Sequence, residues 1–261
     1  MTSQQAVNPP GEKRRDLLRA FYFPVSWLFF VPIFSTLTAF FGSIGICLAY
    51  LAPRFNEWPA NVWARLSCKV NFTSVTVSGK EHIQTGQTYV IMSNHQSHFD
   101  VLALYGHIGI LIRWVIKMEL KKIPFIGGYT YRMGHMFVDR SNRERALSCL
   151  EQGKKRLPPR ASIIFFPEGT RSSNGQLRNF KKGGFHLALD MGLPILPVSI
   201  SGSHKVLPGK SFKLLPGRIK ITVHPPVETG KYDKNNIEEL VHVTREAVKT
   251  ALTPWERGES T

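Results

Sequence analysis

The longest uncharged stretch of the sequence runs from Ala20 to Pro53 and contains no Asp, Glu, Lys or Arg. Phe, Leu, Ile, Val, Trp and Tyr dominate it. A helix needs about 20 apolar residues to cross the hydrocarbon core of a bilayer, so this stretch is long enough. Pro24 and Pro32 are expected to interrupt its first half, whereas residues 33–52 are predicted to form one uninterrupted helix. We therefore predict a membrane-embedded leader, either two helices or one span with a bent approach.

A buried core helix and a cleaved signal peptide fit this stretch less well. A core helix seldom runs this long without a charge, and the apolar run of a cleaved signal peptide has only about 7 to 15 residues. Because basic residues flank both ends, the positive-inside rule gives no orientation. Basic residues on both flanks suit a helical hairpin that dips into one leaflet, and we hypothesise that both ends of such a hairpin lie on the cytoplasmic surface. The flanking residues are Lys13, Arg14, Arg15 and Arg19, then Arg54, Arg65 and Lys69.

After the leader, short apolar runs alternate with amphipathic ones, which is typical of an α/β domain. We predict a membrane-anchoring helical segment over residues 1–60 and a sheet flanked by helices over residues 61–261. Helices are predicted after a Ser141–Glu144 capping box, over residues 182–191 before Gly192, and after Asp233. The predicted strands are residues 74–78, 89–92, 111–116, 136–139, 162–166, 195–200 and 218–223.

The chain is strongly basic, with 34 Lys and Arg against 18 Asp and Glu and a formal net charge of +16. The positive electrostatic field of such a chain attracts polyanions, so nucleic acid, anionic lipid headgroups and phosphorylated substrates are all candidate ligands. The basic residues are spread from Lys13 to Arg257, which disfavours a disordered nucleic-acid-binding arm. The three cysteines form no CxxC pair and no metal-site spacing, so we expect no disulfide, no zinc and a reducing, cytosolic face.

A histidine and an aspartate stand five residues apart in the segment NHQSHFD, residues 94–100, directly after a predicted strand. On a regular helix His95 and Asp100 would lie about 140° apart, so they can meet only if part of the segment is a turn. Imidazole, with a pKa of about 6.5, is suited to removing a hydroxyl proton near neutral pH. A carboxylate on its other ring nitrogen would fix the tautomer. Alone, such a pair is more often a loop histidine with a hydrogen bond.

A second segment, FPEGTR at residues 166–171, also follows an apolar strand. The planar guanidinium of Arg171 suits a phosphate, and backbone amides near Gly169 can add donors. Lys117 and Arg140 each stand at the end of a predicted strand, where they could reach a phosphate, although singly each is more often an ordinary salt-bridging residue. The pattern indicates an anion cradle, although a solvated turn with a surface arginine accounts for residues 166–171 equally well in isolation.

Together these segments resemble a known family. Residues 94–100 resemble the NHxxxxD block of the glycerolipid acyltransferases, and residues 166–171 resemble the FPEGTR block of the 1-acylglycerol-3-phosphate acyltransferases. Residues 117–120 and 134–140 resemble that family's KxEL and GxxxxDR blocks, and residues 193–198 resemble its final proline-containing block. The five blocks occur in the family's order, over about residues 89–201.

The resemblance implies a glycerolipid-acyltransferase-like α/β fold and transfer of a fatty acyl group to the sn-2 hydroxyl of 1-acyl-glycerol-3-phosphate, giving phosphatidic acid. His95 is implied as the general base and Asp100 as its partner. The donor is expected to be acyl-CoA or acyl-carrier protein as a cosubstrate, with no cofactor and no metal. His98, a second imidazole, ranks below His95 because it lies two residues from Asp100. The implied phosphate-site residues are Lys117, Arg140, Glu168, Gly169, Thr170 and Arg171.

The expected partners are the lysophospholipid, the acyl donor and an anionic membrane, with no nucleic acid. We expect the enzyme at a membrane, with its catalytic domain on the cytoplasmic face. One alternative is an acyltransferase for another lysophospholipid or a lyso-ornithine lipid. A more distant alternative is a non-enzymatic basic protein that binds membranes or nucleic acid. A serine hydrolase is disfavoured because the sequence has no GxSxG, and the nine histidines form no HExxH motif.

Overall fold

The computed structural model describes residues 10–124, 126–139, 143–209 and 211–259. Its centre is a seven-stranded sheet in the order β1-β7-β6-β2-β5-β3-β4, in which β6 and β7 are antiparallel and all other neighbours are parallel. All seven predicted strands are confirmed. They are β1 (Thr73–Ser78), β2 (Val90–Ser93), β3 (Ile112–Lys117), β4 (Met136–Val138), β5 (Ser162–Phe165), β6 (Ile195–Ser201) and β7 (Gly217–Val223).

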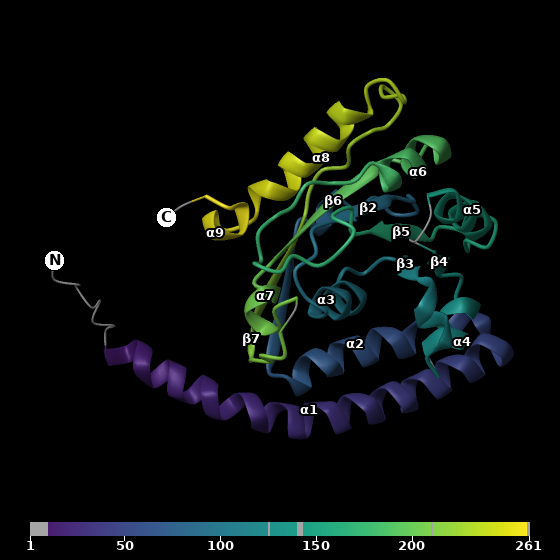
Figure 1. Ribbon diagram of the computed structural model, residues 1–261. Helices are drawn as coiled ribbons and strands as arrows, with labels where there is room; N and C mark the ends of the chain where they lie inside the picture. Colours follow the sequence, from purple (N-terminus) through teal and green to yellow (C-terminus); the bar gives the residue numbers. More distant parts are fainter. Residues whose placement is uncertain (1–9, 125, 140–142, 210, 260–261) are drawn as a thin grey trace, which may run out of the picture.

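Helices cover both faces of this sheet (Figure 1). On one face lie α2 (Trp58–Val70) and α3 (Phe99–His107), and on the other lie α5 (Arg143–Lys154), α6 (Gly183–Met191) and α8 (Ile237–Thr250). Since both faces are covered, the central strand β2 is buried at every residue, which explains its continuous apolar sequence. The shorter helices are η1 (Pro53–Phe55), η2 (Lys80–His82), η3 (Met118–Lys122), α4 (Ile126–Arg132), α7 (Ser203–Val206) and α9 (Pro254–Arg257).

The three predicted helices of the domain are present. Gly192 ends α6 in a left-handed conformation with φ of 60°, as expected for a glycine at a helix C-terminus. The last predicted helix begins at Ile237 and buries its apolar side against the sheet. The predicted capping residue Ser141 lies outside the described residues, and the helix that it was expected to open runs from Arg143 to Lys154.

The leader forms one continuous helix, α1 (Pro10–Leu51), which runs through both prolines. The expected interruption at Pro24 and Pro32 is therefore wrong. A proline removes one backbone donor and bends a helix, but neighbouring packing can hold the helix together. Pro32 lies on the exposed side of α1. Figure 1 shows α1 as one bowed helix that passes beneath α2 and α4.

One side of α1 packs on the domain over much of its length. The Phe30 ring lies 5.9 Å from that of Phe99 in α3, and the Tyr50 ring lies 3.9 Å from the guanidinium of Arg132 in α4. The part from Val25 to Leu51 has a mean hydropathy of 1.8 and is long and apolar enough to cross a membrane, by length and composition. Large apolar side chains on the other side are exposed, among them Leu28, Phe29, Ile33, Phe40 and Leu51.

The expected boundary between residues 60 and 61 falls inside α2, which begins at Trp58. Helix α2 packs between α1 and α3, and Phe30 of α1 belongs to the same buried cluster as Ala64 of α2 and Phe99 of α3. The anchoring segment and the sheet domain therefore share one hydrophobic core on this face of the sheet.

Candidate active site

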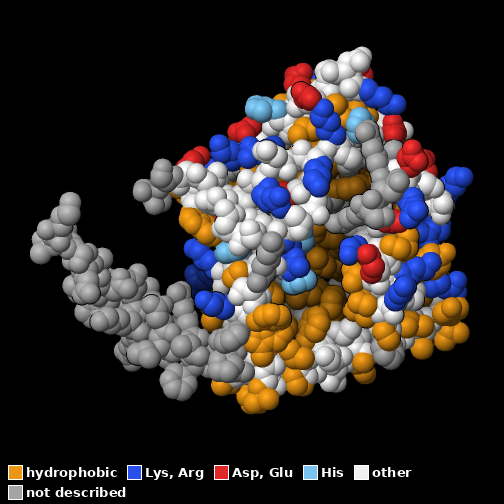
Figure 2. Space-filling view, in the orientation of Figure 1, with side chains coloured by type: hydrophobic (Ala, Val, Ile, Leu, Met, Phe, Trp, Pro, Cys, Tyr) orange, Lys and Arg blue, Asp and Glu red, His pale blue; other side chains and the backbone are white. Residues whose placement is uncertain are grey.

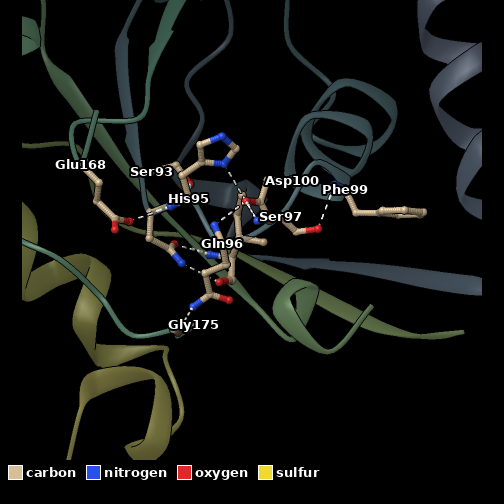
Figure 3. A network of polar contacts seen from close by, with 10 residues as sticks. Ser93, His95, Gln96, Ser97, Phe99, Asp100, Glu168 and Gly175 are labelled. Carbon is tan, nitrogen blue, oxygen red and sulfur yellow. Dashed lines mark hydrogen bonds and ion pairs between the residues drawn. The ribbon is translucent and has the colours of Figure 1, made fainter. Parts of the chain in front are cut away.

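The loop between β2 and α3 brings His95 and Asp100 together (Figure 3). Residues 94–97 are not helical, and α3 begins at Phe99, so the chain makes the turn that the five-residue spacing requires. His95 Nδ1 lies 2.8 Å from Asp100 Oδ2. The same carboxylate oxygen accepts hydrogen bonds from the backbone N–H groups of Gln96 and Ser97, at 2.7 and 2.8 Å. These bonds hold Asp100, which is fully buried, in position to accept a hydrogen bond from the Nδ1–H of His95.

His95 is also held through its ring and its backbone. Its ring stacks on Phe166, with ring centroids 3.8 Å apart. The backbone carbonyl of His95 accepts a hydrogen bond of 2.8 Å from the N–H of Ser172. The side chain keeps 16% exposure. Since Nδ1 faces Asp100, Nε2 is the ring nitrogen left to act on a substrate.

Glu168 is turned inward and does not face the apolar cavity. It is 2% exposed, and its two oxygens accept hydrogen bonds from the backbone N–H groups of His95 and Arg178, at 2.7 and 3.2 Å. Burial raises the pKa of Glu168 to about 7, despite the opposing effect of these two hydrogen bonds. Its position indicates a positioning role that ties the loop after β5 to the loop after β2.

A largely apolar cavity of about 580 Å³ opens beside His95. Figure 2 shows its mouth as a hollow lined with hydrophobic side chains, with histidine and basic residues around it. The cavity extends between β3, α3 and α4 as far as α1 and α2. Its lining includes Phe41 and Gly42 of α1, Trp63 of α2, Trp114 of β3, Tyr129 of α4 and Met133. This volume and lining suit a long apolar ligand whose reacting end lies at His95.

Basic and backbone groups gather at the mouth of this cavity. Lys117, Gly169, Thr170 and Arg171 all line it. Lys117 ends β3, and its ammonium lies 2.9 Å from the exposed carboxylate of Glu119. Burial lowers the pKa of Arg171, while nearby Asp100 opposes that shift. Arg140, the remaining residue expected here, lies outside the described residues.

Gly169 occupies a position that favours glycine. Its φ of +78° is in the left-handed region. A Cβ at this position would also lie 3.0 Å from Lys181 Nζ, tighter than an ordinary contact. The glycine of the FPEGTR segment therefore shapes the turn that presents Thr170 and Arg171 to the cavity.

His98 also lines the cavity. Loss of hydration, followed by electrostatic interactions with Arg171 and with the neighbouring His95 imidazole, lowers the pKa of His98 to about 4, although Asp100 opposes the shift. His98 is therefore neutral at pH 7. His98 has no described hydrogen bond to a carboxylate that would orient its ring. In this respect it differs from His95, whose ring is oriented by Asp100.

Sequence reasoning missed the walls of the cavity. Thr38, Phe41 and Gly42 come from the leader, while Tyr129 and Met133 lie about 90 residues further along the chain. No local motif marks these positions, because only the packing of α1 against α4 brings them together.

Three comparisons with known proteins find relatives of this chain. A family model described as Acyltransferase matches residues 74–201. A 1-acyl-sn-glycerol-3-phosphate acyltransferase of Chlamydomonas reinhardtii is 32% identical over 247 residues, covering 92% of this chain and 71% of the relative. The chloroplastic enzyme of that name from Arabidopsis thaliana is 32% identical over 182 residues, covering 69% of this chain and 51% of the relative. The alpha form of Bos taurus is 32% identical over 179 residues, covering 68% and 62%.

A solved structure is similar over nearly the whole chain. The crystal structure of PlsC, the 1-acyl-sn-glycerophosphate acyltransferase of Thermotoga maritima, superposes with a TM-score of 0.76 at 26% identity and covers 92% of this chain and 95% of that one. The α/β sheet with flanking helices and an N-terminal apolar helix is thus a known acyltransferase fold. Because the Chlamydomonas relative is 32% identical and is matched over 71% of its length, this chain belongs to the 1-acyl-sn-glycerol-3-phosphate acyltransferase family of O-acyltransferases.

Proposed function

We propose that this enzyme transfers a fatty acyl group from acyl-CoA or acyl-carrier protein to the sn-2 hydroxyl of 1-acyl-glycerol-3-phosphate, giving phosphatidic acid for phospholipid synthesis. The proposal is carried by one observation. A histidine whose Nδ1 is held 2.8 Å from a buried carboxylate stands at the mouth of an apolar cavity of about 580 Å³. The names of the matched relatives supply the acceptor.

The reaction follows from the two nitrogens of His95. Nε2 takes the proton of the acceptor hydroxyl as its oxygen attacks the thioester carbonyl, and Asp100 stabilises the imidazolium that forms. The tetrahedral intermediate collapses, the C–S bond breaks, and the proton on Nε2 passes to the leaving thiolate. An ester and a free thiol result, and the base returns to its starting state. A positioned base of this kind contributes about 10²- to 10⁴-fold in rate.

The apolar cavity and the basic residues beside it bind the acyl chain and the acceptor phosphate, respectively. The apolar cavity takes an acyl chain, because its walls offer a long ligand few polar partners. Arg171 and Lys117 line this cavity, and their positive charges favour the acceptor phosphate. Arg140 is proposed as a third phosphate-binding group from its place in the GxxxxDR block.

We also propose that α1 lies along one leaflet of the membrane, with the catalytic domain on the cytoplasmic face. From Phe30 to Tyr50, a length of about 30 Å, α1 packs on the domain. A helix that crossed the bilayer along this length would carry the adjoining domain surface into the hydrocarbon. Lying in the plane instead, it places Leu28, Phe29 and Phe40 in the lipid. Basic residues on both flanks then stay near anionic headgroups.

A panel of acceptors tests the function. Purified enzyme is incubated with a long-chain acyl-CoA or acyl-carrier protein and, in turn, lysophosphatidic acid, other lysophospholipids and a lyso-ornithine lipid, and products are measured by mass spectrometry. We expect phosphatidic acid to form with the highest kcat/KM. Faster acylation of another acceptor would reassign the substrate. No acylated product with any acceptor would contradict the proposal.

A further inference from the structure

A second cavity, polar in character, lies beside the catalytic one. It has a volume of about 530 Å³ and shares Thr170 and Arg171 with the apolar cavity. The loop that follows β5 forms it, so the cavity lies outside the family's sequence blocks except at those two residues. Its other described lining residues are Ser173, Asn174, Gln176, Leu177 and Arg178.

The residues that line this cavity carry a net positive charge. Arg171 and Arg178 are both among them, and none of its described lining residues is acidic. Within the part of the chain that the structure describes, neither arginine forms a salt bridge. Two cationic forks beside hydroxyl and amide donors match the oxygens of a phosphate group.

The wall of the cavity is fixed to the catalytic loop. Gln96, the neighbour of His95, donates its side-chain amide to the carbonyl of Gly175 at 2.8 Å (Figure 3). The carboxylate of Glu168 accepts from the backbone N–H groups of both His95 and Arg178, at 2.7 and 3.2 Å. One buried carboxylate therefore sets the backbone positions of the general base and of an arginine in the second cavity.

Hydrogen bonds within the loop hold its shape without a ligand. Asn174 Oδ1 accepts from the Ser172 hydroxyl at 2.9 Å and from the N–H of Gln176 at 3.2 Å. Asn174 Nδ2 donates to Gln176 Oε1 at 2.8 Å. A wall that is already ordered costs a ligand less conformational entropy on binding.

We propose that this polar cavity is a phosphate subsite, in which Arg178 and Arg171 bind the phosphate of one of the enzyme's two substrates. The inference rests on the proposed function, because that reaction brings together two phosphate-bearing molecules. The acceptor carries a phosphate monoester near the reacting hydroxyl, and the donor carries a phosphodiester or pyrophosphate at the far end of its pantetheine arm. Neither phosphate changes in the reaction, so Arg178 contributes equally to ground-state and transition-state binding.

The test compares Arg178→Gln with Lys234→Gln, which removes one positive charge from the exposed loop before α8. KM and kcat of the purified full chain are measured for lysophosphatidic acid and for acyl-CoA at fixed ionic strength. We expect Arg178→Gln to raise one of the two KM values about tenfold with little change in kcat. Lys234→Gln should change neither, and Arg178→Lys should restore part of the loss.

Substrates that lack a phosphate show whether the acceptor phosphate or the donor phosphate binds in the polar cavity. If the acceptor phosphate binds here, Arg178→Gln raises KM for lysophosphatidic acid but not for 1-acylglycerol. If the donor phosphate binds here, it raises KM for acyl-CoA but not for the N-acetylcysteamine thioester of the same acyl chain. KM values that match those of Lys234→Gln for both substrates would overturn the subsite, as would a fall in kcat with unchanged KM.

Calorimetry separates this inference from the proposed function. Coenzyme A and glycerol 3-phosphate are titrated into wild type and Arg178→Gln without turnover. If wild type acylates no acceptor, the proposed function fails, yet about tenfold weaker binding of either probe by Arg178→Gln still supports the subsite. Equal binding of both probes by the two proteins overturns the subsite, even where wild type is an active acyltransferase.

Discussion

The imidazole of His95 lies flat against the phenyl ring of Phe166, with ring centroids 3.8 Å apart and ring planes inclined by only 8°. The two residues follow β2 and β5, which are neighbours in the sheet. The stacked ring prevents tilting of the imidazole, and the hydrogen bond to Asp100 prevents rotation within its plane. Together, the two contacts aim Nε2 in one direction.

Removing the stacked ring should weaken catalysis more than binding. Phe166→Ala is expected to lower kcat about tenfold, because ring contacts of this kind are worth about 0.5–1.5 kcal/mol and the freed imidazole samples unproductive orientations. Phe166→Tyr keeps the ring and should stay near wild type. Steady-state kinetics with both variants checks this, and an unchanged kcat in Phe166→Ala would show that the stacking has no orienting role.

Glu168 should make stability depend on pH in a defined direction. Burial raises its folded-state pKa to about 7 from an ordinary 4.5, so between these values the folded chain binds more protons than the unfolded one. Its contribution is complete below about pH 4.5 and is lost as pH rises through 7. The free energy of unfolding of wild type minus that of Glu168→Gln should therefore fall by up to about 3 kcal/mol over this window.

Denaturant titrations at a series of pH values measure this difference. Glu81→Gln, at an exposed position, is the control and should show no comparable trend. A difference between wild type and Glu168→Gln that stays constant from pH 4.5 to 8 would contradict a buried Glu168 carboxylate.

The depth of the apolar cavity should set the length of the acyl chain that the enzyme accepts. Gly42 of α1 lines the cavity, so Gly42→Leu is expected to shift preference towards shorter chains, with a change of about tenfold or more in relative kcat/KM. Gly128→Leu is the matched control, because a Cβ at Gly128 meets nothing within 4 Å. Competition among acyl-CoA chain lengths, read by mass spectrometry, measures the shift. The same change in both variants would show that this cavity does not set the acyl-chain-length preference.

Cys47 reports whether the outer side of α1 lies in lipid. It is exposed on α1, whereas Cys68 is buried and Cys149 is partly exposed. With the protein bound to anionic vesicles, a water-soluble maleimide should label Cys149 but not Cys47, and dissolving the vesicles in detergent should expose both. Labelling of Cys47 as fast as Cys149 on intact vesicles would contradict the in-plane position of α1.

Much of the fold could be predicted because its signals are local. The central strands β2 and β5 are short apolar runs, β1 and β7 alternate apolar and polar residues, and Gly192 marks the end of α6. The turn between His95 and Asp100 followed from helix geometry alone, since the two could not meet otherwise. The leader was predicted wrongly at its two prolines. A proline usually interrupts a helix, but packing along α2 and α4 keeps α1 continuous.

The site could be predicted only where it lies in motifs. His95, Asp100 and Arg171 stand in segments whose order resembles a family. The inward turn of Glu168 could not be inferred, because a carboxylate in a segment expected to bind phosphate suggests a surface group until its backbone partners are known. The place of Arg178 beside Arg171 likewise depends on how the loop after β5 folds back onto the catalytic loop.

In the proposed reaction His95, and not its neighbour His98, removes the proton of the acceptor hydroxyl. Rates of phosphatidic acid formation from lysophosphatidic acid and acyl-CoA, compared for His95→Ala and His98→Ala at saturating substrates, test it most directly. We predict that His95→Ala lowers kcat by about 10²- to 10⁴-fold, the usual contribution of a positioned base. His98→Ala should keep kcat within about tenfold of wild type. Retained kcat in His95→Ala, or a larger loss in His98→Ala, would contradict the account.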